Sequence, residues 1–71
     1  MRAEDAKWLL EQYLMVDREL VRIVDELEDR VPEIEASPHQ DDIGRVIVRL
    51  SHAVDRVLKE HPELRPAGMD E

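Results

Sequence analysis

The fold is decided by residues 6–27, AKWLLEQYLMVDRELVRIVDEL, in which apolar side chains recur at alternating spacings of three and four. Such spacing places them along one side of an α-helix. This first stripe consists of Ala6, Leu9, Tyr13, Val16, Leu20, Ile23 and Leu27. A second stripe has the same spacing and consists of Ile43, Ile47, Leu50, Val54 and Val57. About half of the other side chains in these segments are charged, so the pattern predicts two helices with one apolar face each.

Prolines set the predicted ends of both helices. Pro32 ends the first, because its ring clashes with the carbonyl four residues back, and we predict a helix over 3–30 about 40 Å long. The run SPHQ at 37–40 has Ser at the N-cap, Pro at the first helical position and Gln at the third, as in a capping box. We therefore predict the second helix over 38–61, ending before Pro62.

The predicted architecture is all-α, a two-helix antiparallel hairpin formed by residues 1–61. Residues 62–71 hold two of the four prolines and one of the two glycines, and we expect them to form a flexible tail. Two apolar residues outside the stripes are expected to pack on the helices. They are Ile34 in the connector and Leu64 in the tail.

The apolar surface is too wide for a single hairpin to bury. At 100° per residue the first helix is apolar over about half its circumference. Its flank carries Leu10, Leu14, Val21 and Val24, and the second helix carries Val46, Ala53 and Leu58 beside its stripe. One hairpin gives each helix one neighbour, and a large exposed apolar face marks an interface.

We therefore predict that two hairpins form a four-helix bundle about a two-fold axis. The alternative is burial against a different protein with a matching helical face. The predicted dimer core consists of Leu9, Tyr13, Val16, Leu20, Ile23, Leu27, Ile43, Ile47, Leu50, Val54 and Val57.

Composition excludes several other classes. The 71 residues make one domain at most, and the absence of Cys removes disulfides and thiolate zinc sites. Because the chain contains no Cys, no apolar run near 20 residues and no signal-like start, we expect a cytoplasmic location and no membrane contact. A net charge of −8 opposes binding to a phosphate backbone, so we expect no direct nucleic-acid binding.

Two apolar side chains of the first helix fall outside its apolar arc. Trp8 and Met15 lie seven residues apart on the polar side, where exposed Trp and Met side chains often anchor a protein partner. We predict a partner-binding surface formed by Trp8, Gln12, Met15 and Glu19. The alternative is structural, with Trp8 covering the open end of the bundle.

The histidines do not form a metal site within one chain. His39 and His61 project onto the core side near opposite ends of the second helix, roughly 33 Å apart. They could approach each other only between two copies packed antiparallel, and we predict that both are rim residues.

The sequence spacing of the acidic residues can be compared with that of one class of enzymes. All-α nucleotide pyrophosphohydrolases bind Mg²⁺ through acid pairs three residues apart on neighbouring helices. Asp25–Glu28 and Glu26–Asp29 have this spacing, but the second helix has no matching pair. We predict no enzyme, no cofactor and no metal.

The predicted function is protein–protein interaction by a dimer, as an adaptor, assembly factor, inhibitor or regulatory subunit. Two alternatives stay open. One is the Mg²⁺-dependent hydrolase, and the other is an acidic mimic of nucleic acid that blocks a DNA-binding protein. The mimic would use a row of acids on the first helix: Glu11, Asp25, Glu26 and Asp29.

Overall fold

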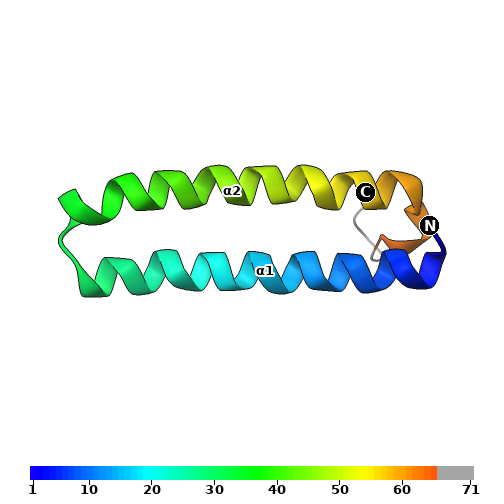
Figure 1. Cartoon of the computed structure of the whole chain (residues 1–71), viewed down its shortest axis with the longest axis horizontal. Coiled ribbons are helices and arrows are strands. Elements are labelled where there is room, and N and C mark those ends of the chain that lie inside the picture. The colour runs from blue at the N-terminus through cyan, green and yellow to red at the C-terminus, as the bar shows by residue number, and fades with distance from the viewer. Residues whose placement is uncertain (66–71) are drawn as a thin grey trace.

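The computed structural model describes residues 1–65 and is a rod of two helices with a longest extent of 44 Å. Helix α1 (Ala3–Arg30) and helix α2 (Glu33–Glu60) lie antiparallel, side by side along their whole length (Figure 1). A short 3₁₀ helix, η1 (Pro62–Leu64), folds back at the end where the N-terminus lies (Figure 1). The all-helical, two-helix part of the fold prediction is confirmed.

Helix α1 has the bounds that its sequence predicted. Glu4 and Asp5 lie in its first turn and Arg30 in its last, so each charge opposes the nearby end of the helix dipole. Val31 then adopts extended backbone, as expected of a residue that precedes proline, and its N–H donates to the Leu27 carbonyl.

Helix α2 begins at Glu33, five residues before the predicted start, so the capping-box prediction is wrong. Pro32 holds the N-cap position, and its carbonyl accepts hydrogen bonds of 2.9 Å from the N–H groups of Glu35 and Ala36. Pro38 therefore lies inside the helix, in its second turn, where its missing N–H removes one helical hydrogen bond. The lost hydrogen bond is offset, because the earlier start of α2 places two acids in its first turn and buries Ala36.

Two smaller predictions about the connector and tail change with this boundary. Ile34 points outward from the first turn of α2 and is 84% exposed, so its predicted packing on the hairpin is wrong. Pro62–Leu64, at the start of the predicted flexible tail, form the 3₁₀ helix η1, and Leu64 is half-buried as expected. Residues 66–71 of that predicted tail lie outside the described part of the chain.

The core between the helices is thin. Ala6, Ala36, Val57 and Leu58 are its only buried residues within 1–65. The α1 side of the contact also includes half-buried residues, some from the predicted stripe and some from its flank: Leu10, Tyr13, Leu20, Val24 and Leu27. The line of contact thus passes between the two apolar flanks of α1, and each flank stays partly open.

Neither of the two long helices within 1–65 is apolar enough over a sufficient length to cross a membrane.

Candidate protein-interaction surface

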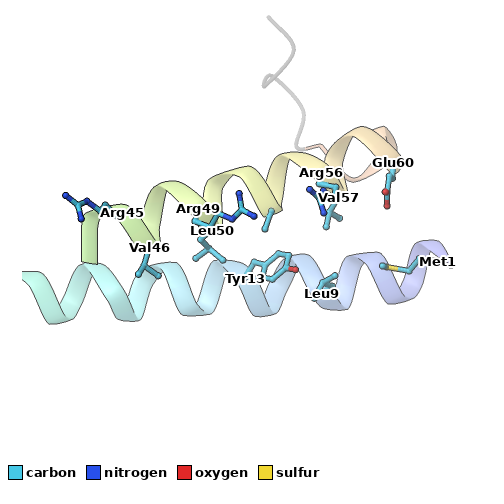
Figure 2. A pocket seen from close by; sticks show the side chains of 11 residues that line it. Met1, Leu9, Tyr13, Arg45, Val46, Arg49, Leu50, Arg56, Val57 and Glu60 are labelled. Carbon is cyan, nitrogen blue, oxygen red and sulfur yellow. The ribbon is translucent and has the colours of Figure 1, made fainter. Parts of the chain in front are cut away.

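A groove of about 700 Å³ runs along one side of the hairpin between α1 and α2. Its apolar walls come from both helices, as Figure 2 shows. They are formed by Leu9, Tyr13, Val46, Leu50, Ala53 and Val57. Leu50 and Val57 are predicted core residues that also touch the interhelical line, so the groove is an open continuation of the core.

The apolar side of the groove extends along α1 beyond the residues that line it. Val16 and Ile23 follow Leu9 at intervals of seven and therefore lie on the same side of the helix. Val16 is 48% exposed and Val46, across the groove, is 51% exposed. We call this side, with Leu9, Val16, Ile23, Val46 and Ala53 at its centre, the groove face.

Three arginines form the α2 edge of the groove face. Arg45, Arg49 and Arg56 all line the groove from α2 (Figure 2). Arg49 and Arg56 make no ion pair with any residue in 1–65. Arg45 reaches only Asp42, at 4.0 Å. An apolar floor beside unpaired cations suits an occupant that is apolar in the middle and acidic at its edge.

The α1 edge of the same face carries a chain of acids and arginines. Glu19 and Glu26 both bind Arg22, and Glu26 also binds Arg30, at 2.6 Å. The hydrogen bond from Arg22 holds the pKa of Glu19 below its ordinary value, and the one from Arg30 does the same for Glu26. These exposed ion pairs stabilise α1 only weakly, but they hold its charged side chains in defined positions.

The opposite side of the hairpin is a poorer docking surface. Leu14 and Val21 are exposed on α1, but the matching line on α2 contains Gly44 and Ser51. A Cβ built on Gly44 meets nothing within 4 Å, so no backbone of the described chain approaches it. Leu58, on this same line, is buried at the end where η1 packs back onto α2.

The predicted partner surface is exposed along α1. Trp8 is 61% exposed and Met15 is almost equally so, while Gln12 is half-buried and Glu19 is tied to Arg22. Gln12 and Glu19 lie on the side of α1 that faces the groove edge, with Trp8 and Met15 further round the helix. All four residues therefore share one continuous surface with the rim of the groove face.

The histidines and acids considered for metal binding stay apart. His39 is exposed, and the half-buried His61 ring lies 3.1 Å from the Glu63 carboxylate. A backbone hydrogen bond, with a smaller contribution from His61, lowers the pKa of Glu63. Within residues 1–65 no three His, Asp or Glu side chains are grouped so that they could hold a metal ion.

The acidic row proposed for nucleic-acid mimicry is interrupted at its centre. Glu26 is neutralised by two arginines, and Arg22 bridges it to Glu19. A phosphate-like line of free negative charge is therefore broken where it would need to be continuous.

Sequence reasoning missed the basic edge of the groove. The signal was present, because Arg45, Arg49 and Arg56 are spaced by four and seven residues and so fall on one side of a helix. The net charge does not reveal it, because the four basic residues in 38–61 are balanced by four acidic ones.

No protein-family model, curated protein or solved structure matches this chain.

Proposed function

We propose that this chain is a protein–protein interaction module that acts as a dimer, serving as an adaptor, assembly factor, inhibitor or regulatory subunit. The observation that carries the proposal is the imbalance between core and surface. Four residues are buried, while ten large hydrophobic side chains are exposed within residues 1–65. A helix pair this small is marginal alone, and burying those side chains against another helical surface would stabilise it.

In this proposal two surfaces of the chain bind different partners. The groove face takes a second copy, because its α1 residues Leu9, Val16 and Ile23 belong to the predicted dimer core. The surface of Trp8, Gln12, Met15 and Glu19 takes a different protein, because exposed Trp and Met side chains anchor partners efficiently. This second surface has one charged residue, the acidic Glu19, and no basic residue, which favours a protein partner over a nucleic acid.

The partner surface is tested by affinity capture from a lysate, with the full chain as bait. Trp8→Ala is expected to keep its helical circular dichroism and to lose captured protein. Val48→Ala is the matched control, since Val48 is 56% exposed on α2 and lies outside both surfaces. Capture that is equal for both variants would overturn this use of Trp8. A collapse in helicity for Trp8→Ala would instead assign that side chain to structural cover.

A further inference from the structure

We infer that the second copy packs on the groove face with the two-fold axis parallel to the long axis of the hairpin. Helix α1 of each copy then lies against α2 of the other, and both connectors are at the same end. This inference rests on the proposed dimer and adds its geometry. The observation behind it is that charged residues on the α1 edge of the groove face have residues of opposite sign at the same level on α2.

Symmetry fixes the register of such a dimer. A two-fold axis along the hairpin moves no residue along that axis, so a residue of α1 meets the α2 residue that is level with it in its own chain. The internal level is set by Gln40, whose side chain donates to the Val24 carbonyl at 3.4 Å and the Glu28 carboxylate at 3.2 Å. At the other end, Leu9 and Val57 share the groove.

Counting along the antiparallel helices from those contacts gives the pairs between copies. Glu19 is level with the interval between Arg45 and Arg49 of the second copy. Arg30 is level with Glu35 of the second copy. Two charge contacts of opposite polarity thus recur on each side of the dimer, and the apolar Ile23 lies between them, level with Ile43.

The same register places an aromatic ring beside a cation. Trp8 is level with Arg56 of the second copy, and each lies toward the outer edge of its own helix. Arg56 makes no ion pair within residues 1–65 and is free to stack on the indole ring. Trp8 would then stand at the boundary of two subunits, so the partner surface is built by both.

The other closed arrangement is less favourable. With the two-fold axis perpendicular to the hairpin, α1 packs on α1 and α2 on α2. Arg49 lies near the middle of α2 and would approach its own copy, with Arg45 one turn away. The opposite side of the hairpin offers only small or polar α2 residues, Gly44 and Ser51, to a second copy.

Disulfide cross-linking tests this geometry directly, because the chain has no natural Cys. Gln12→Cys and Ala53→Cys are prepared separately, mixed, exchanged and oxidised. Both side chains point across the proposed α1–α2 boundary at one level, within the reach of a disulfide. Ser51→Cys replaces Ala53→Cys as the control, since it lies at a similar level on the opposite side of α2. We expect the mixed disulfide with Ala53→Cys in several-fold excess over that with Ser51→Cys.

The cross-linking results distinguish the proposed packing of the two copies from the alternatives. Equal cross-linking by the two α2 positions, or efficient self-cross-linking of a Val16→Cys variant through α1–α1 contact, would overturn it. The mass of each mixture before oxidation separates the two proposals, because a dimer with the wrong cross-links contradicts the geometry alone. A monomeric mass would contradict both the proposed dimer and its geometry, whether the groove of the monomer is empty or filled by another protein.

Trp8 fluorescence provides a second readout, since it is the only Trp in the chain. Trp8 and Arg56 lie on the outer sides of different helices within one hairpin, so contact between them needs a second copy. Arg56→Ala is expected to change the Trp8 emission of the dimer, whereas Arg45→Ala, eleven residues and about three turns away on the same edge of α2, is not. Emission unchanged by Arg56→Ala would contradict the proposed stacking and its register.

Discussion

Single charged residues set the pattern of the groove edges. Glu26 is held by Arg22 and Arg30 on α1, whereas Arg49 and Arg56 on α2 have no acidic partner in residues 1–65. Within residues 1–65, ion pairs thus run along the groove edge of α1 from Glu19 to Arg30, while two of the three arginines on the α2 edge have none. Unpaired exposed arginines cost little in water, and they become useful when a complementary surface arrives.

The paired acids predict how stability depends on pH. The pKa values of Glu19 and Glu26 are lowered from 4.5 by hydrogen bonds from arginine. A carboxyl whose pKa is lowered by folding contributes stability above its ordinary pKa and loses it as pH falls through the lowered value. We therefore expect the urea midpoint to fall as pH is lowered below about 4.5, and to fall less in Glu26→Gln. An equal acid response in both proteins would contradict this role of Glu26.

At the scale of the element, the start of α2 separates what could be predicted from what could not. Hydrophobic spacing and Pro32 gave the bounds of α1, because its caps and its periodicity agree. At α2 the local capping signal and the tertiary contacts favour different starting residues. The SPHQ run is a good local start, but an earlier start buries Ala36 and adds a helical turn, and that gain depends on tertiary contact with α1.

The early start predicts an unusual response to substitution. Pro38→Ala restores a donor to the Ile34 carbonyl in the second turn of α2, and we expect it to raise the free energy of unfolding by about 1–2 kcal/mol. Ser37→Ala should be neutral or slightly stabilising, since Ser37 is inside the helix. If Ser37 were an N-cap, its removal would lower stability by about 0.5–2 kcal/mol. Urea titration at a fixed protein concentration distinguishes the two.

The candidate site also has some features that could be predicted from the sequence and others that could not. The exposure of Trp8 and Met15 followed from helical periodicity alone, because both lie outside the apolar arc. The groove depends on which flank of each helix faces its neighbour, and one-helix projections do not determine that. Val16 and Ile23, expected at the centre of the stripe, are exposed because the α1–α2 contact passes nearer to Leu10 and Val24.

At the scale of the whole molecule, one hairpin is an incomplete structure. Its helices share a narrow line of contact, and the apolar residues on either side of that line meet water. A second hairpin on the groove face would give each helix a further neighbour and convert the exposed Val16 and Val46 into core. Burial of this kind is how small domains without disulfides or metals commonly become stable.

Sedimentation equilibrium of the full chain at micromolar concentration tests whether the hairpin dimerises. We expect a helical particle with twice the chain mass of 8.3 kDa, dissociating only on dilution. A species of 8.3 kDa that keeps its full helical circular dichroism at that concentration would contradict it, because the hairpin would then be stable with its groove face exposed.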